Sequence, residues 1–344
     1  MTGEERIIKN AEMLNDAYLI GNPYARDFQL KELTSCLRPA LEGKKPTHAW
    51  LYGRPGTGKT LVAKFVLREL SREGLLGGTY VNCWENNSYY AVLDKLVREL
   101  RILGAEKLNT AFKLERFRHF VGSRPFIIVL DEVDQARRLE RDALVYNLCG
   151  VGKVGLVMIS NSADAFLTLD DRIKSRLNAR TLEFECYSPG RLMAILRQRI
   201  EVALAAGTAD EAVLSKVTAL SEGDARMAFK ILNQAAQNAE ADGSAAIGMD
   251  HVLSAHTSVK VIKKEALFAE LSSHHKLLYD LVKQRGEVNS GELWEAYLAE
   301  SRRLGRPAIA LRTYSEYMNR LIELELVQWD RALVRGKVRM FRVE

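Results

Sequence analysis

Hydrophobic positions in the first half of the chain follow two alternating patterns. Short apolar runs bounded by polar or glycine-containing turns indicate strands, and longer segments with apolar residues three or four positions apart indicate helices. The strands are expected at residues 49–52, 79–82, 126–130 and 154–160, and the helices at 1–20, 28–41, 61–70, 88–103 and 111–121. This alternation predicts a unit of the α/β class.

In the second half of the chain, the sequence pattern first indicates helices alone and then a mixture of helices and strands. Periodic segments that end at glycines predict an all-helical unit, and three later helices followed by two short strands are typical of a winged helix. The helices are expected at 191–204, 210–220, 224–241, 267–283, 291–304 and 309–324, and the strands at 326–329 and 338–343. Residues 257–264 are expected to link the last two units. The predicted domains span residues 1–186, 187–258 and 265–344.

One glycine-rich stretch indicates the chemistry of the first unit. Residues 53–60 read GRPGTGKT and fit the phosphate-loop pattern G-x-x-x-x-G-K-[ST]. Glycines let backbone N–H groups approach phosphates, Lys59 can reach the β- and γ-phosphates, and the Thr60 hydroxyl can bind Mg²⁺. A coincidental turn is the alternative, and the flanking strand and helix argue against it. The residues expected to contact ATP or ADP here are Gly53, Pro55, Gly56, Thr57, Gly58, Lys59, Thr60 and Leu61.

Polar side chains follow two of the later apolar strands. Asp131 and Glu132 end the strand at residues 126–130 in a Walker B pattern, which places a carboxylate at the C-terminal end of a buried strand. We expect Asp131 to hold Mg²⁺ through water and Glu132 to orient the attacking water. Asn161 ends the strand at residues 154–160 and is a candidate sensor of the γ-phosphate. The alternative is a turn asparagine, since Asn-Ser is good turn chemistry.

Composition narrows the class of protein. The 344 residues are 47% hydrophobic and 27% charged, and no apolar run approaches the ~20 residues of a membrane span. Residues 1–10 are charged and lack the apolar core of a signal peptide, so we expect a cytoplasmic, nucleoid-associated protein with no membrane partner. The four cysteines have no C-x-x-C spacing, which favours reduced, buried thiols over disulfides or a zinc site.

The net charge of +6 is concentrated near the C-terminus. Residues 302–342 hold ten basic and four acidic side chains, which accounts for the whole excess. A basic end on a neutral body indicates an anionic polymer as partner, and we expect double-stranded DNA. A winged helix that binds protein is the alternative. The candidate DNA contacts are Arg312, Thr313, Tyr314, Tyr317 and Arg320 on the third helix, beside Glu316, and Arg331, Arg335, Lys337 and Arg339 on the hairpin.

Together these motifs resemble the AAA+ ATPases, and specifically the archaeal replication initiators of the origin recognition complex and cell division control type. The resemblance rests also on residues 169–177 (LDDRIKSRL), 184–199 (FECYSPGRLMAILRQR) and 223–226 (GDAR). It implies an α/β AAA+ P-loop ATPase core with a parallel sheet, an all-α helical lid and a C-terminal winged-helix domain. Such a protein binds origin DNA and uses ATP binding and slow, regulatory hydrolysis as a switch.

The resemblance also assigns roles to single residues. Tyr187 and Arg199 match positions that contact the nucleotide, and Arg226 matches the sensor 2 arginine that reaches the γ-phosphate from the lid. Arg176 matches the arginine finger, which acts on the nucleotide of a neighbouring subunit. The family often has Ser at that position, and Arg172 competes for the role. The chain also departs from the family at residue 162, where it has Ser in place of the usual Asp.

The family inserts a helical initiator-specific motif into its ATPase core, which touches DNA. Residues 98–118 lie in the corresponding place, and their basic side chains are Arg98, Arg101, Lys107, Lys113, Arg116 and Arg118. The implied partners are origin DNA and other initiator subunits, with the replicative helicase a further candidate. Two other functions fit the motifs: a clamp-loader or helicase-loader type ATPase, and a regulatory P-loop NTPase whose winged helix is an internal clamp.

Overall fold

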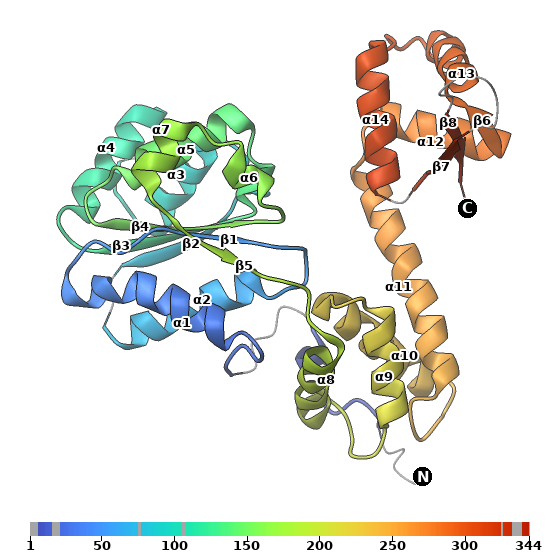
Figure 1. Ribbon diagram of the computed structural model, residues 1–344, viewed down its shortest axis with the longest axis horizontal. Helices are drawn as coiled ribbons and strands as arrows, with labels where there is room; N and C mark the ends of the chain where they lie inside the picture. The colour runs from blue at the N-terminus through green and yellow to red at the C-terminus, as the bar shows by residue number, and fades with distance from the viewer. Residues whose placement is uncertain are drawn as a thin grey trace. The chain divides into compact units, whose positions relative to one another are not determined.

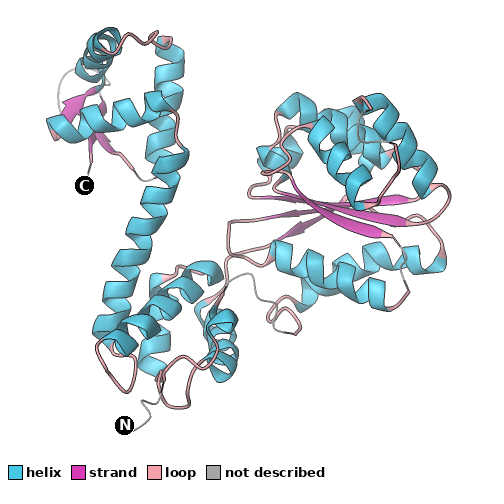
Figure 2. Ribbon diagram, turned by 180° about the vertical axis from the view of Figure 1, so that it is seen from behind, coloured by secondary structure: helices cyan, strands magenta, loops and turns pink. Residues whose placement is uncertain are grey.

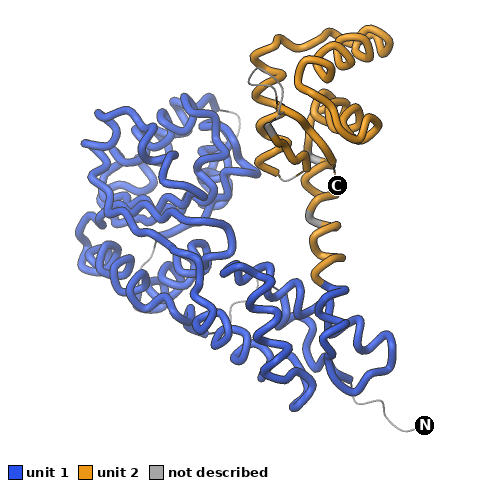
Figure 3. The backbone as a smooth tube through the Cα atoms, turned by 45° about the vertical axis from the view of Figure 1, so that its right-hand side comes forward, with its two compact units in different colours: residues 1–255 blue, residues 256–344 orange. Residues whose placement is uncertain are grey.

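The computed structural model describes residues 6–15, 21–74, 77–104, 108–324, 326–331 and 339–343. The chain forms two compact units, residues 1–255 and 256–344 (Figure 3). The boundary falls inside helix α11 (Met249–Glu270), so the segment expected to link the units is helical.

A five-stranded parallel sheet forms the centre of the ATPase part of the first unit. Its strand order is β2-β3-β4-β1-β5. Side chains alternate between the two faces, so Trp50 enters one core while Ala49 and Leu51 enter the other. The strands are β1 (Ala49–Tyr52), β2 (Gly78–Asn82), β3 (Phe126–Asp131), β4 (Val154–Ser160) and β5 (Arg180–Glu183). Strand β5 was not predicted, because three of its four residues are exposed and it therefore lacks the apolar run that indicates a buried strand.

Helices cover both faces of this sheet, with α1 and α2 on one side and α3 to α7 on the other (Figure 1, Figure 2). Polar caps fix several starts: the side chains of Ser88 and Asn109 accept hydrogen bonds from the first turns of α3 and α4. The helices are α1 (Asp27–Leu37), α2 (Lys59–Arg72), α3 (Tyr89–Glu99), α4 (Thr110–Val121), α5 (Arg138–Cys149), α6 (Asp164–Leu167) and α7 (Asp171–Leu177). Two 3₁₀ helices, η2 (Arg38–Glu42) and η3 (Val133–Gln135), complete the layers.

The lid of the first unit is helical, as predicted. It contains α8 (Pro189–Ala203), α9 (Glu211–Leu220), α10 (Ala225–Ala241) and the start of α11. The expected helix at residues 1–20 is wrong for the described residues 6–15, which hold only a 3₁₀ helix, η1 (Ala11–Leu14). This segment packs on the lid because Ile7 and Leu14 enter the lid core and the backbone N–H groups of Lys9 and Asn10 donate to the carbonyl of Ala203.

In the described residues of the second unit, three helices follow the end of α11 and pack with a three-stranded antiparallel sheet of order β6-β8-β7, as in a winged helix. Its elements after α11 are α12 (Ser273–Arg285), β6 (Glu287–Asn289), α13 (Ser290–Arg303), α14 (Leu311–Glu323), β7 (Gln328–Arg331) and β8 (Arg339–Arg342). The helix expected at residues 267–283 is divided, because the side chain of Ser272 caps a new helix, α12. The side chain of Asn289 caps α13, and the short strand β6 was not predicted.

All four cysteines are free thiols. Cys36, Cys83 and Cys149 are buried as expected, whereas Cys186 is exposed in the segment between β5 and α8. Across the part of the chain that the structure describes, no helix has the length and apolar character needed to cross a bilayer.

Candidate nucleotide-binding site

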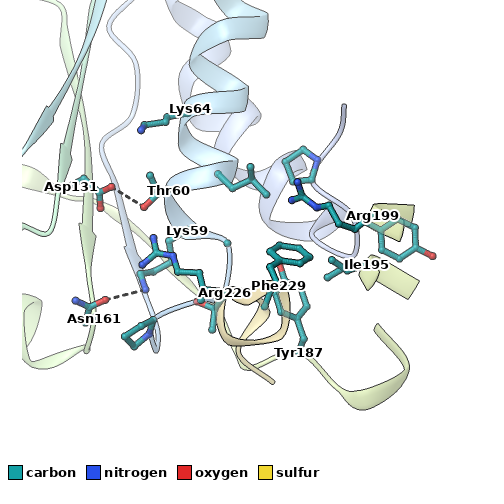
Figure 4. Close-up of a pocket in the computed structure, with 18 of the residues that line it drawn as sticks. Lys59, Thr60, Lys64, Asp131, Asn161, Tyr187, Ile195, Arg199, Arg226 and Phe229 are labelled. Carbon is teal, nitrogen blue, oxygen red and sulfur yellow. Dashed lines mark hydrogen bonds between the residues drawn. The ribbon is translucent and has the colours of Figure 1, made fainter. Parts of the chain in front are cut away.

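A cavity of about 300 Å³ opens at the C-terminal edge of the parallel sheet, between the phosphate loop and the lid helices α8 and α10 (Figure 4). The topology explains why the predicted motifs meet here. Strand β4, which leads to Asn161, lies between β1, which leads to the phosphate loop, and β3, which ends at Asp131. The ends of neighbouring parallel strands share one edge of a sheet, so motifs far apart in the sequence line one cavity.

The phosphate loop has the backbone conformation that its glycines allow. Gly56 and Gly58 have φ angles of +73° and +88°, in the left-handed region that side chains with a Cβ rarely adopt. Gly58 immediately precedes α2, so the N-terminal end of that helix begins at Lys59 and lines the cavity. A helix N-terminus presents unpaired N–H groups and a partial positive charge, which together favour an anion.

Lys59 is held inside this loop and is only 6% exposed. Its Nζ donates to the carbonyl oxygens of Gly53 and Arg54, at 2.6 and 2.9 Å, and to Oδ1 of Asn161 at 3.3 Å. Burial lowers the pKa of this ammonium to about 8, and the Asp131 carboxylate partly opposes the shift. The expected γ-phosphate sensor therefore contacts the expected phosphate-binding lysine directly (Figure 4).

Two oxygen-bearing side chains meet beside the loop in a way that fits Mg²⁺. The Thr60 hydroxyl donates to Oδ2 of Asp131 at 2.7 Å. Hydroxyl and carboxylate oxygens are ligands that Mg²⁺ accepts while it keeps phosphates and waters in its other positions. Among the described residues there is no cluster of three or more His, Cys, Asp or Glu side chains that could hold a metal ion. Thr60 and Asp131 would hold the ion, which when bound would neutralise phosphate charge.

Glu132 lines the same cavity in an unusual backbone conformation. Its φ of +54° places it in the left-handed region, where a residue other than glycine is under strain. Burial, and after it the Asp131 carboxylate, raise the pKa of Glu132 above its ordinary value. A partly desolvated carboxylate at this place can accept a hydrogen bond from a water near the phosphates, as its predicted role requires.

Tyr187 and an unpredicted arginine support the loop from the lid side. The guanidinium of Arg26 lies 4.1 Å from the centroid of the Tyr187 ring and donates to the carbonyl of Thr57 at 3.0 Å. A Cβ added to Gly58 would lie 2.7 Å from the Tyr187 hydroxyl, so ring and loop are in close contact. Arg26 stands in no motif, and no sequence signal indicated its role.

Arg199, which the resemblance assigns to nucleotide contact, is held by the N-terminal segment. It lines the cavity, but its guanidinium lies 4.2 Å from the Phe229 ring and donates to the carbonyl oxygen of Met13 at 2.6 Å. It also donates to the carbonyl oxygen of Asn15 at 3.4 Å. These bonds join the N-terminal segment to the lid, which the sequence did not show, and the predicted contact of Arg199 with the nucleotide stays a prediction.

Arg226 and Arg176 occupy different places around the first unit. Arg226 lines the cavity from α10, near enough to Lys59 and Glu132 for its charge to lower the pKa of both groups. Arg176 and Arg172 lie on the exposed side of α7, and neither is among the residues that line the cavity. The guanidinium of Arg176 lies 4.4 Å from the ring of Tyr146 on α5.

The segment expected to be an initiator-specific motif is partly structural. Lys113 is fully buried, where its Nζ contacts the Asp94 carboxylate and donates to the Tyr90 hydroxyl at 3.0 Å. It joins α4 to α3 and is therefore not available to DNA. Arg116 and Arg118 are exposed on α4. Arg98 and Arg101 are also exposed, and Lys107 lies outside the described residues.

The candidate DNA contacts on α14 divide between the surface and the core. The side chains of Arg312 and Arg320 are exposed, at 92% and 55%. Tyr314 is only 4% exposed and its hydroxyl donates to the carbonyl of Ser290 at 3.1 Å, so its assignment as a DNA contact is corrected to a packing role. Thr313 and Tyr317 are half-buried.

The hairpin of the second unit is described in part. Arg339 on β8 is exposed, lies 4.9 Å from the Trp329 ring and donates to Oδ1 of Asn319 on α14 at 2.8 Å. The backbone of Arg331 pairs with that of Arg339 in the antiparallel ladder. The side chain of Arg331, together with Arg335 and Lys337, lies outside the described residues.

Comparison with known proteins gives similarity over the whole chain. A family profile described as AAA ATPase domain matches residues 22–159, and one described as Cdc6 AAA+ ATPase-type lid domain matches residues 193–257. The chain is 30% identical to ORC1-type DNA replication protein 1 of Halobacterium salinarum, over 85% of this chain and 95% of that one.

Two solved structures are also similar. The Aeropyrum pernix ORC1 protein in complex with DNA aligns with a TM-score of 0.86 and 30% identity, over 100% of this chain and 94% of that chain. The Aeropyrum pernix ORC2 protein in ADPNP-ADP complexes aligns with a TM-score of 0.63 and 20% identity, over 98% and 94% respectively. The second likeness shows the shared fold.

Proposed function

The chain belongs to the family of ORC1-type DNA replication proteins, and we propose that it is an ATP-dependent initiator that binds origin DNA. The observation that carries the nucleotide part is the convergence of Lys59, Asn161 and Asp131 on one cavity behind a phosphate loop. Lys59 begins the helix after the phosphate loop, whereas Asp131 and Asn161 stand at the ends of β3 and β4, and each has the chemistry that a Mg²⁺-bound triphosphate requires.

The DNA part of the proposal rests on similarity and on exposed charge. The Aeropyrum pernix ORC1 structure, which aligns over this whole chain, is a complex with DNA. Arg312 and Arg320 lie on the exposed side of α14, the third helix of the winged helix, and Arg339 lies on the hairpin. In winged helices the third helix enters the major groove and the hairpin reaches the backbone or minor groove. Residues 265–344 would therefore grip the duplex.

The proposed switch lies between the ATPase core, residues 1–186, and the lid, residues 187–258. Arg226 stands on the lid within electrostatic range of Lys59, which belongs to the core. A γ-phosphate at Lys59 would attract the Arg226 guanidinium, and ADP would not supply that charge. ATP and ADP would thus favour different positions of the lid.

Hydrolysis in this proposal is slow and depends on assembly. Arg176 and Arg172 lie on the exposed side of α7, away from the cavity of their own chain. Either one could act as an arginine finger only on the nucleotide of a neighbouring initiator subunit. The replicative helicase is a further proposed partner, and the nucleoid is the proposed location.

Salt dependence tests the DNA assignment directly. Equilibrium binding of the full-length protein to duplex DNA should weaken by about a thousandfold or more between about 50 and 200 mM salt, since several phosphates are neutralised. Affinity that barely changes over this range would overturn the assignment. Mapping of bound sites across the genome of the source organism should place them at replication origins.

A further inference from the structure

A tyrosine outside every recognised motif contacts the predicted metal-binding carboxylate. Tyr80 lies on β2, which pairs with β3 so that Asn82 stands opposite Asp131. The Tyr80 hydroxyl donates to Oδ2 of Asp131 at 2.8 Å, and Tyr80 lines the nucleotide cavity. Strand β2 therefore supplies a polar group to the site beside those of β1, β3 and β4.

We propose that Tyr80 is a positioning residue for Mg²⁺, because it fixes the Asp131 carboxylate so that one acceptor site remains directed to the ion. This inference deepens the proposed function and rests on it, since it assumes that the cavity takes a nucleotide with its metal. Tyr80 itself would touch Asp131 and not the metal.

The hydrogen bonds of Asp131 support this assignment by a count of acceptor sites. A carboxylate offers about four lone-pair sites. Oδ2 accepts from Tyr80 and from the Thr60 hydroxyl, at 2.8 and 2.7 Å, and Oδ1 accepts from the backbone N–H of Glu132 at 2.9 Å. Three sites are thus occupied by donors from three different elements. The remaining site, on Oδ1, is the one available to a metal-bound water.

Lys64 contacts the face of the Tyr80 ring. Its Nζ lies 3.9 Å from the centroid of the Tyr80 ring, and the residue stands one helical turn after Thr60 on α2. A cation over the ring face is attracted to the ring and draws electron density from it, which makes the hydroxyl a better donor. The phenol is therefore fixed by α2 on its face and by Asp131 at its hydroxyl.

A purely structural tyrosine would behave differently from a positioning residue. Tyr80 packs partly against the hydrophobic core on the α1 and α2 side of the sheet, so loss of packing would lower stability and nucleotide affinity whatever the metal concentration. A residue that orients Asp131 would instead change the Mg²⁺ dependence alone. Measuring ATP binding with and without the metal separates the two roles.

The test is the Tyr80→Phe variant of the full-length protein, which keeps the ring and removes the hydroxyl. The Mg²⁺ concentration for half-maximal ATP binding should rise about tenfold, as is common when a group that orients a metal ligand is lost. ATP affinity in EDTA should match that of the unmodified protein, and the melting temperature should fall only slightly, as expected for the loss of one hydrogen bond. Tyr52→Phe is the matched control. Tyr52 ends β1 and does not line the cavity, and its hydroxyl lies 3.5 Å from the Glu183 carboxylate on β5.

A second variant covers the case in which Tyr80→Phe fails to fold. Lys64→Met keeps an apolar stem over the ring and removes the charge, and it should raise the same Mg²⁺ concentration by about two- to threefold. An unchanged Mg²⁺ dependence in the folded variants would overturn the positioning role and leave the proposed function in place. The same conclusion would follow if ATP affinity in EDTA fell as much as ATP affinity with Mg²⁺. Absence of Mg²⁺-dependent ATP binding in the unmodified protein would instead remove the proposed function, and this inference with it.

Discussion

The backbone N–H of Ala225 donates to the carbonyl oxygen of Gly56 at 3.2 Å, which joins the first residue of a lid helix to the phosphate loop. The preceding residue, Asp224, caps that helix by accepting from the N–H groups of Arg226 and Met227. The loop that would bind phosphate and the helix that carries Arg226 are therefore in direct contact. A change in the loop on nucleotide binding would reach the lid through this backbone contact as well as through Arg226.

Gly56→Ala should disrupt this contact. A Cβ at Gly56 would lie 1.8 Å from Oδ1 of Asp224, and φ there is +73°, so the variant has both a clash and backbone strain. We expect a loss of stability of about 1–3 kcal/mol and ATP affinity at least tenfold weaker. Gly43→Ala is the control, since its φ of +70° gives the same strain with nothing within 4 Å of the added Cβ. Calorimetric titration with ATP and thermal unfolding would show equal effects in the two variants if the lid contact were unimportant.

The pKa of Lys59 predicts how ATP binding depends on pH. Burial lowers that pKa to about 8, and a bound triphosphate would favour the charged form. ATP affinity should therefore be nearly constant below pH 8 and fall by up to about tenfold per pH unit above it, because binding then requires uptake of a proton. Fluorescence titrations between pH 7 and 10 would measure this, and a flat profile would contradict the assignment.

The lowered pKa of Lys59 also affects the stability of the nucleotide-free protein, and here a rise in pH is favourable. The folded-state pKa of Lys59, about 8, lies below the ordinary lysine value of 10.5, so the unfolded state binds more protons between these values. The contribution of Lys59 to the free energy of unfolding should increase as pH rises from 8 to 10.5. Lys59→Met should remove this part of the pH dependence, which can be measured by denaturant unfolding.

The residues of the nucleotide site that the sequence indicated are those in local motifs. Lys59, Thr60 and Asp131 each belong to a short pattern whose residue order reflects the chemistry. Tyr80 and Arg26 were missed because their contacts join residues 51 and 31 positions apart, and such contacts follow from strand pairing and loop packing. The contact of Arg199 with the N-terminal segment was missed for the same reason, since it joins residues 186 positions apart.

Two substitutions on α14 should separate DNA contact from packing. Arg312→Ala should weaken duplex binding and reduce the slope of log affinity against log salt by about one, because its side chain is 92% exposed and can exchange its surface ion pair with Glu316 for a phosphate. Tyr314→Phe should lower the free energy of unfolding by about 1 kcal/mol through loss of the bond to Ser290, and leave the salt slope unchanged. Salt-dependent DNA titrations and denaturant unfolding of both variants test this division. A change in the salt slope for Tyr314→Phe, with no change for Arg312→Ala, would contradict it.

Helical periodicity explains which part of α14 was misread. Tyr314, Met318 and Leu321 are spaced three and four residues apart and form the buried face of the helix. The clustering of basic and aromatic residues had placed Tyr314 among the candidate DNA contacts. The spacing alone places Tyr314 inside and Arg312 outside, so this division was available from the sequence. The new start of α12 at Ser273 was harder to find, because it depends on a single capping serine, Ser272.

The central claim is that one unit of the chain binds ATP while the other binds DNA, and Lys59→Ala tests it most directly. ATP affinity and duplex-DNA affinity should be measured on one preparation of the folded, full-length variant. We expect ATP binding to be abolished, because the buried lysine that the phosphate loop holds at its centre is removed, and weak nonspecific DNA binding to remain. Equal loss of both activities in a folded variant would contradict the claim.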